Sequence, residues 1–394
     1  MSDIFSKCFS YTTAKEVMAA GFYPYFIPMT DNEGTEAIYQ GKRLIMCGSN
    51  NYLGLTTHPR VRQAALDAIN RFGTSCTGSR FVNGTLELHE QLERELAEYV
   101  DKPTALVFST GMQTNLGTIS ALVSRGDVVV LDKDDHASIV DGAKLSWGDT
   151  KRFRHNDSGD LERVLAAIPE DKGRLVVIDG LDSMGGDIAP LPEIIQSCQK
   201  YGARLMVDDA HAMGVLGGGR GTAAHFGLTE QVDLIMSTFS KSFASIGGFV
   251  AGDADVIHFI KHHARSLIFS ASIPPASAAA ALEALHIMRD EPELSERVMD
   301  IGHFMCRELT TLGFDIGCSQ SPIIPIMIGD DMRTLFTWKL LFENGVFVNP
   351  VLSPAVPEGK QLLRTSYMAT HTDDQLHRVL EVYETVGKQV GLIS

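Results

Sequence analysis

The chain has 394 residues, of which 44% are apolar and 21% are charged. A chain of this length favours two packed units with a core large enough to fold without disulfides or metals. Asp and Glu number 49 against 34 Lys and Arg, which gives a net charge of −15. This acidic balance argues against nucleic acid as a partner, because nucleic-acid binding favours a basic face.

The compartment is indicated by cysteine usage and by the N-terminal residues. Six cysteines are scattered without a CxxC pair, a pattern typical of reduced thiols. No basic segment followed by an apolar one opens the chain, so no signal peptide is expected. No uncharged apolar run approaches the ~20 residues that a membrane span requires. We therefore expect a cytoplasmic protein without a transmembrane segment.

The texture of the sequence changes twice along the chain. Residues 1–50 form an N-terminal arm of mixed character. Residues 51–285 are predicted to form a large α/β domain, in which short apolar runs alternate with helical stretches from residue 104 onward. Residues 286–394 are predicted to form a smaller α+β domain.

Six apolar runs of strand length mark the sheet of the large domain. Their continuous apolar character is typical of strands buried on both faces of a mostly parallel sheet. Each run ends in polar or glycine-rich residues, at the edge where open α/β sheets place ligand sites. The runs are TALVFST, DVVVLD, RLVVIDG, RLMVDDA, DLIMSTFS and GGFVAG.

One of these runs leads into an isolated lysine. In STFSKSFASIGGF, Lys241 is the only charged residue between Asp233 and Asp253. An unpaired buried ammonium is costly, so the lysine either reaches water from a loop or has a chemical role. Common nucleotide signatures do not explain it, because no GxGxxG follows a strand and no GxxxxGK[ST] occurs.

Polar residues at other strand ends would lie close to Lys241. RLMVDDAHAMG places Asp208 at a strand end with His211 shortly after it, and two further runs lead into His136 and Ser183. Alone, Asp208 could be a cap or an ion-pair partner, and Asp with His also suits zinc or manganese. Together with a lysine, however, these are the groups that pyridoxal phosphate needs: an amine for its aldehyde and a carboxylate that keeps its ring nitrogen protonated.

A flat phosphorylated ring also needs a stacking partner and an anion site. His136 could stack on the ring. The FSTGMQTN segment could bind phosphate through backbone N–H groups at a helix start, although alone it is an ordinary strand–helix connection.

Taken together, these motifs resemble those of the α-oxoamine synthases, fold-type I pyridoxal-phosphate enzymes that join an amino acid to an acyl-CoA thioester with loss of CO2. The resemblance runs from SNNYLGL at 49–55 to LLRTSYMATHTDDQL near the end. It implies an aspartate-aminotransferase-like α/β fold, with a mostly parallel sheet in the large domain, and a homodimer with its site at the subunit interface. The other motifs are GSR…NGT…H, FSTGMQTN, DDHASIVDGA, SMGGDIAPL, VDDAHAMGVLG, TFSKSFASIGG and FSASIPP.

The resemblance implies roles for individual residues around the cofactor. Lys241 would bind it covalently, Asp208 would pair with the ring nitrogen, and His136 would stack on the ring; these three are the predicted catalytic residues. Ser272 would reach the phosphate of the partner subunit. The remaining predicted cofactor contacts are His211, Gly111, Met112, Ser183, Thr238 and Ser240.

The resemblance also predicts a substrate site. Arg364 in LLRTSYMA resembles the arginine that binds the substrate carboxylate, whose planar fork suits a bidentate contact; a salt bridge on a terminal strand is the alternative. Asn51 and Arg80 are assigned to the same site. Arg80 and the basic residues between 151 and 154 could meet CoA phosphates or form a solvated face. No metal site is expected.

Within the family, GFYPYFIPM, GSRFVNGT, SKSFASIGGF and GVFVNPVLSPAVP look most like bacterial serine palmitoyltransferases. This resemblance implies condensation of L-serine with palmitoyl-CoA to 3-ketosphinganine, the first step of sphingolipid synthesis, and leaves peripheral membrane contact open. One departure is Asp182, where the family usually has an apolar or aromatic residue. If Asp182 faced the site it could alter amino-acid choice; otherwise it points away.

Three alternatives stay open. A relative that uses glycine or alanine would be a 2-amino-3-ketobutyrate CoA ligase or an 8-amino-7-oxononanoate synthase. The chain could instead be a non-catalytic subunit of the family, although retention of Lys241, Asp208 and His136 argues against that. A metal-dependent hydrolase that uses the Asp and His strand ends is the most distant alternative.

Overall fold

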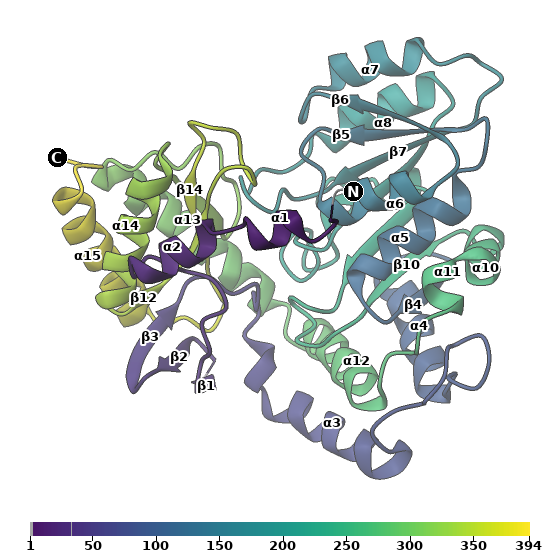
Figure 1. Cartoon of the computed structure of the whole chain (residues 1–394). Helices are drawn as coiled ribbons and strands as arrows, with labels where there is room; N and C mark the ends of the chain where they lie inside the picture. Colours follow the sequence, from purple (N-terminus) through teal and green to yellow (C-terminus); the bar gives the residue numbers. More distant parts are fainter. Residues whose placement is uncertain (1–2, 33) are drawn as a thin grey trace.

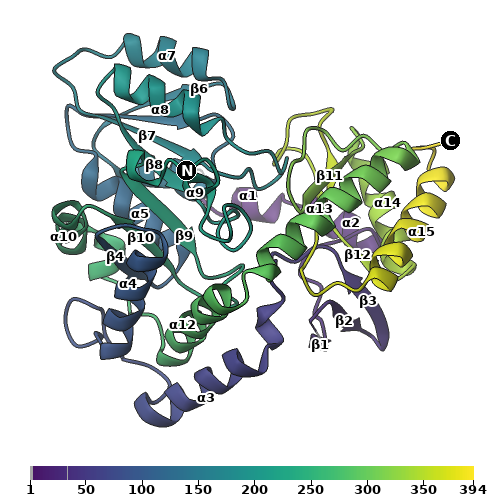
Figure 2. The same ribbon diagram turned by 180° about the vertical axis from the view of Figure 1, so that it is seen from behind.

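The computed structural model describes residues 3–32 and 34–394. They form two bodies joined by α12 (Pro275–Asp290) and α13 (Glu293–Leu312), as Figures 1 and 2 show. The larger body holds the central sheet, and the smaller one holds the C-terminal residues and most of the N-terminal arm. Helix α1 (Ser6–Phe9) lies between the two bodies in both views.

The central sheet has seven strands in the order β4-β10-β9-β8-β7-β5-β6. Only β10 runs against its neighbours, so the predicted mostly parallel sheet is confirmed. All six predicted apolar runs are strands of this sheet. The strands are β4 (Thr104–Phe108), β5 (Val128–Asp132), β6 (Asp149–Phe153), β7 (Arg174–Asp179), β8 (Arg204–Asp208), β9 (Leu234–Thr238) and β10 (Gly248–Gly252).

Helices cover both faces of this sheet. In β5, Val128 and Val130 join one buried cluster, and Val129 and Leu131 join the other, because alternate strand residues point to opposite faces. The first cluster includes α12 and also α3 (Pro59–Phe72), α4 (Glu87–Tyr99), α7 (Ser158–Ala166) and α8 (Leu191–Lys200). The second includes α5 (Gly111–Leu122), α6 (Ala137–Leu145), α10 (Ala254–His263) and α11 (Arg265–Ile268).

Strand β6 had no apolar signal in the sequence. It lies at the edge of the sheet, and in its segment DTKRF only Phe153 is buried. Charged side chains on an edge strand protect its unpaired backbone from other chains, which hides the strand from a search for apolar runs.

The smaller body contains two sheets. Strands β11 (Ile323–Met327), β14 (Leu362–Ser366) and β13 (Asn349–Val351) form one, packed with α13, α14 (Asp331–Glu343) and α15 (Asp373–Gln389). The other is formed by β1 (Asp31–Asn32), β2 (Glu36–Tyr39) and β3 (Lys42–Met46) of the arm together with β12 (Val346–Phe347).

The arm is thus tied to the C-terminal residues, because β3 pairs in parallel with β12. The predicted domain limit at residue 285 lies within α12, where Leu285 is buried in the core of the larger body. The division into an arm and two domains stays a prediction. Among the described residues, no helix is both long and apolar enough to cross a bilayer.

Candidate active site

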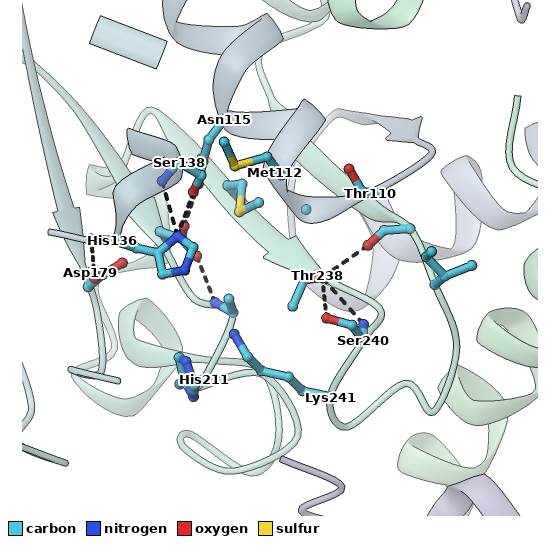
Figure 3. Close-up of a pocket in the computed structure, with 16 residues that line it drawn as sticks. Thr110, Met112, Asn115, His136, Ser138, Asp179, His211, Thr238, Ser240 and Lys241 are labelled. Atoms are coloured by element: carbon cyan, nitrogen blue, oxygen red, sulfur yellow. Dashed lines mark hydrogen bonds between the residues drawn. The ribbon is translucent and has the colours of Figure 1, made fainter. Parts of the chain in front are cut away.

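A cavity of about 360 Å³ opens at the carboxyl edge of the central sheet. The ends of β7, β8 and β9 and the first turns of α5 and α6 line it (Figure 3). It collects many of the predicted residues, namely Gly111, Met112, His136, Asp208, His211, Thr238, Ser240 and Lys241. The rest of the lining consists of Thr110, Asn115, Ser138, Asp179, Ala210, Met236, Ile246 and Gly247.

Lys241 follows β9 and extends into this cavity, as Figure 3 shows. Burial lowers the pKa of its amine from 10.5 to about 8, and the positive charge of Arg364 acts in the same direction, against the carboxylates of Asp208 and Asp179. An amine with a pKa of about 8 is partly neutral near neutral pH. It can therefore act as a nucleophile or as a base.

Asp208 ends β8 and is held by hydrogen bonds at both carboxylate oxygens. Asn115 Nδ2 donates to Oδ2 at 2.7 Å, and the Ala210 N–H donates to Oδ1 at 2.9 Å. Asn115 Nδ2 also lies 2.8 Å from Ser138 Oγ, so it links α5, α6 and β8. This buried carboxylate is thereby fixed in orientation beneath the cavity.

The ring of His136 is oriented by its own helix. His136 is the N-cap of α6, and its Nδ1 accepts from the Ser138 N–H at 3.2 Å. Its backbone N–H donates to Asp179 Oδ2 at 3.0 Å. Burial, followed by the charge of Lys241, lowers the pKa of His136 against the influence of Asp208. A neutral ring with a fixed orientation suits stacking on a planar ligand.

Away from His136, the start of α5 together with Thr238 and Ser240 forms a polar cup in the cavity wall. Thr110 caps α5 by accepting from the Gln113 N–H at 3.1 Å, and the first N–H groups of a helix have no intrahelical acceptor. A Cβ on Gly111 would lie 2.7 Å from Thr238 Oγ1, so only glycine lets α5 begin this close to β9. Ser240 Oγ is 3.0 Å from Thr238 Oγ1. A helix N-terminus beside two hydroxyls is well suited to an anion.

A second group of residues surrounds Arg364, which lies on β14. Its Nε donates to the Ser183 carbonyl at 2.5 Å, and its Nη2 donates to Asn50 Oδ1 at 3.0 Å and to the Tyr52 hydroxyl at 3.4 Å. The Tyr52 hydroxyl is 2.7 Å from His211 Nδ1, which connects this group to the cavity.

The guanidinium of Arg364 is buried, and none of the described carboxylates forms an ion pair with it. Arg364 is only 5% exposed. The alternative of a salt bridge on a terminal strand therefore does not hold. Because an uncompensated buried charge is costly, this site is suited to an anionic ligand such as a carboxylate.

Two predicted substrate residues make contacts elsewhere in the chain. Asn51 donates from Nδ2 to Thr56 Oγ1 at 2.9 Å, whereas its neighbour Asn50 contacts Arg364. Arg80 forms a buried two-point contact with Glu93, at 2.8 and 3.1 Å, and does not line the cavity. Their substrate roles stay predictions.

Ser183 and Asp182 lie in a turn beside Arg364. Ser183 contributes its carbonyl oxygen to the arginine. The Asp182 carboxylate is buried in its own turn, where it accepts the N–H groups of Met184, at 2.9 Å, and Gly185. Asp182 does not line the cavity, as expected if it points away.

Ser272 also lies outside the cavity lining. It is buried, and its hydroxyl has no hydrogen-bond partner among the described residues. Its backbone N–H donates to the Gly78 carbonyl at 2.9 Å, which places it beside the GSR…NGT…H motif at residues 78–89.

Sequence reasoning did not assign roles to Asn115, Tyr52 or Asp179. Asn115 lies one helical turn after Gly111, so its i, i+4 spacing was a usable signal. Asp179 ends β7 and pairs in register with Asp208, and burial followed by that neighbour raises its pKa well above the usual range. No sequence pattern marked Tyr52 as a site residue, because a tyrosine in a loop can equally well pack in the core.

Comparison with known proteins agrees with this geometry. Residues 42–382 match the family model for aminotransferase class I and II. A serine palmitoyltransferase from Sphingobacterium spiritivorum is 50% identical over 98% of this chain and 96% of its own length. An 8-amino-7-oxononanoate synthase from Thermoanaerobacter pseudethanolicus is 41% identical over the full length of both proteins.

A solved structure of a serine palmitoyltransferase (SPT) with pyridoxal phosphate superimposes on the whole chain. Its TM-score is 0.97 at 37% sequence identity, and all of both chains is covered. The chain therefore belongs to the aminotransferase class I and II family and, within it, to the α-oxoamine synthases.

Proposed function

We propose that this chain is a pyridoxal-phosphate-dependent serine palmitoyltransferase. It would join the Cα of L-serine to the carbonyl carbon of a long-chain acyl-CoA, with CoA and CO2 as leaving products and 3-ketosphinganine as the product that starts sphingolipid synthesis. The observation that carries the reaction class is Lys241, a lysine of lowered pKa, beside Asp208 in one cavity. The choice of serine and palmitoyl-CoA rests on the relatives at 47–50% identity.

The residues of the cavity fit pyridoxal phosphate. Lys241 would bind the aldehyde, Asp208 would face the ring nitrogen, and His136 would cover one ring face. The cup at the start of α5, with Thr238 and Ser240, would hold the phosphate. When bound, the cofactor supplies an electron sink that stabilises negative charge on the amino-acid Cα.

The remaining steps use side chains of this chain. Arg364 would hold the serine carboxylate through its planar fork, oriented by Ser183 and Asn50. Lys241, as a neutral amine, would accept the Cα proton and later return a proton to the product. The negative charge of Asp208, held by Asn115 and Ala210, would keep the ring nitrogen protonated during these transfers.

A second copy of the chain would complete the site. The contact of Ser272 with a partner's phosphate stays a prediction, because its hydroxyl is buried in the single chain beside residues 78–89 and has no hydrogen-bond partner among the described residues. Large apolar side chains are exposed nearby, with Phe81 59% and Phe269 75% accessible. We therefore expect a homodimer in which these surfaces are covered; the cytoplasmic location stays an expectation from cysteine usage.

A substrate panel tests the proposal. Holoenzyme is incubated with serine, glycine or alanine and with a short- or long-chain acyl-CoA, and release of the CoA thiol is measured. We expect the highest kcat/KM with L-serine and palmitoyl-CoA. Preference for glycine or alanine with a shorter acyl-CoA would instead indicate a 2-amino-3-ketobutyrate CoA ligase or an 8-amino-7-oxononanoate synthase.

The same panel separates the remaining alternatives. A non-catalytic subunit would release no CoA with any pair. A metal-dependent hydrolase would lose activity in the presence of a chelator; within the described residues, no group of three or more His, Cys, Asp and Glu is arranged to hold a metal ion.

A further inference from the structure

The turn at residues 182–187 lies directly behind Arg364. It is closed by two backbone hydrogen bonds, from the Asp182 N–H to the Asp187 carbonyl at 2.9 Å and from the Gly186 N–H to the Asp182 carbonyl at 3.2 Å. Near its start, the Ser183 carbonyl accepts from Arg364 Nε. The turn therefore orients the Nε side of the guanidinium, while Asn50 and Tyr52 hold Nη2.

One side of the turn is docked on the smaller body. The Gln320 N–H donates to the Gly186 carbonyl at 2.9 Å, and the Ile188 N–H donates to Gln320 Oε1 at 3.2 Å. Gly186 has a φ of 71°, and a Cβ there would lie 2.0 Å from the Ile323 carbonyl oxygen. The turn therefore fits against this surface only with glycine at position 186.

The other side is held by His155, which follows β6. Its Nδ1 is 2.9 Å from Asp132 Oδ1, and its Nε2 is 3.0 Å from Asp187 Oδ2. The two carboxylates raise the pKa of His155 from 6.5 to about 11, so both ring nitrogens carry a proton near neutral pH. The imidazolium thus donates to the end of β5 on one side and to the turn on the other.

Asn156 strengthens the same connection. Its side-chain Nδ2 donates to Asp187 Oδ2 at 2.6 Å, and its backbone N–H donates to Asp132 Oδ2 at 2.9 Å. Because the nitrogens of His155 lie on opposite sides of the ring, the two carboxylates do not converge on a common point as metal ligands would. The cluster is a bridge between two segments.

We propose that His155 is a positioning residue for the amino-acid substrate: clamped between Asp132 and Asp187, it holds the 182–187 turn where the Ser183 carbonyl orients Arg364. This inference rests on the proposed function, in which Arg364 binds the amino-acid carboxylate. Without the clamp, the turn keeps the Asn156 contact to Asp187 and its contacts with the smaller body, but it loses the imidazolium that joins it to the end of β5. The Ser183 carbonyl then loses its fixed position beside Arg364.

Loss of the clamp formed by Asp132, His155 and Asp187 can be distinguished from general destabilisation of the protein by comparing two ligands. A misoriented Arg364 weakens binding of a ligand that has a carboxylate but not of one that lacks it. L-serine and ethanolamine form such a pair, because they differ only in the carboxylate. The ratio of their dissociation constants therefore reports on the orientation of Arg364.

The experiment uses holoenzyme with His155→Gln or Asp187→Asn, and binding of each amine is followed by the change in cofactor absorbance. We expect L-serine to bind roughly tenfold more weakly or worse in each variant, with the ethanolamine dissociation constant and the KM for palmitoyl-CoA unchanged. The double variant should lose no more than the worse single one, because both substitutions break one connection.

His286→Gln is the matched control. His286 also contacts two carboxylates, Glu95 at 2.8 Å and Glu283 at 3.2 Å, and its side chain is 33% exposed against 30% for His155. It lies on α12, which packs on α4, and it has no contact with the turn. The control should keep the wild-type ratio of serine to ethanolamine affinity.

The proposal would be overturned if the ratio of the serine to the ethanolamine dissociation constant were unchanged in both clamp variants. This holds whether neither amine or both amines bind more weakly. Asp187→Asn keeps the shape of the side chain and serves if His155→Gln does not fold. The proposed function is judged separately, by serine-dependent CoA release in the wild type. For an enzyme that used glycine, the same ratio would be measured with glycine and methylamine.

Discussion

The two halves of the site are built in different ways. The half around Lys241 comes from neighbouring strand ends and helix starts of one sheet, between residues 110 and 247. The half around Arg364 combines the arm at Asn50 and Tyr52, the 182–187 turn of the larger body and β14 of the smaller one. Only the second half depends on how the two bodies are placed.

This difference separates chemistry from recognition. The register of a buried parallel sheet fixes Asp208, and Lys241 follows three residues after the end of β9 in the same sheet. The carboxylate site around Arg364 joins both bodies, so a motion between the bodies would shift it. Such a motion would not change the positions of the residues at the edge of the central sheet. We expect substitutions in the first half to reduce kcat, and those in the second to raise the KM for the amino acid.

The largest effect is expected for Lys241→Ala. Without the amine, the protein should lose covalently bound cofactor and its yellow absorbance, and condensation should fall by at least about 10²–10⁴-fold, since nucleophile and base are both removed. Lys388→Ala, which removes an exposed lysine paired with Glu384 on α15, serves as the control. A colourless Lys241→Ala variant with full activity would contradict the assignment.

Asp208→Asn should reduce catalysis but keep the cofactor. The amide has the shape of the carboxylate and can still accept from Ala210, but it cannot hold the ring nitrogen protonated. We expect turnover to fall roughly 10²-fold or more, with cofactor absorbance retained. Single-turnover rates with saturating serine measure this, and unchanged turnover would count against the role of Asp208.

The same contrast explains what the sequence could predict. Strand-end polar residues after continuous apolar runs placed Lys241, Asp208 and His136 together, because parallel strands end at one edge. The contacts of Arg364 could not be predicted, since they join residues far apart in the chain, 181 positions for Ser183 and 314 for Asn50. Spacing along the sequence carries no information on how two bodies dock.

For two further predicted residues, neighbours in space decide contacts that the sequence did not indicate. Asn51, in the motif SNNYLGL, donates to Thr56, and the neighbouring Asn50 contacts Arg364; a substrate role for Asn51 stays a prediction. Arg80 forms an ion pair with the buried Glu93, and its predicted role in anion binding is still untested. In both cases the partner lies on another element.

Arg364→Gln should affect binding of serine more than turnover. The loss of a charged contact to the carboxylate is worth about 2 kcal/mol, or roughly 30-fold in affinity. We expect the KM for L-serine to rise by that factor while the KM for palmitoyl-CoA stays constant. Arg364→Lys keeps the charge without the fork and should show a smaller rise. An equal rise in both KM values would show that the site as a whole had been disturbed.

The smallest expected effect is a pH dependence of stability that comes from the clamp. The folded-state pKa of His155, about 11, lies above its ordinary value of 6.5. The contribution of His155 to the free energy of unfolding is therefore fully present below pH 6.5 and is lost as the pH rises toward 11. The loss is at most about 1.4 kcal/mol per pH unit, and screening at this partly exposed site reduces its total. Thermal melting of wild type and His155→Gln between pH 7 and 9 measures it.

The difference in stability between wild type and His155→Gln separates the contribution of His155 from those of other titrating groups. Lys241 acts in the opposite sense, because its lowered pKa makes stability rise with pH from about 8 upward, but it is present in both proteins and cancels. The advantage of wild type should therefore narrow steadily from pH 7 to pH 9. A constant gap would mean that His155 is neutral in the fold and donates from one nitrogen only. The turn beside Arg364 would then be held by Asn156 and not by an imidazolium.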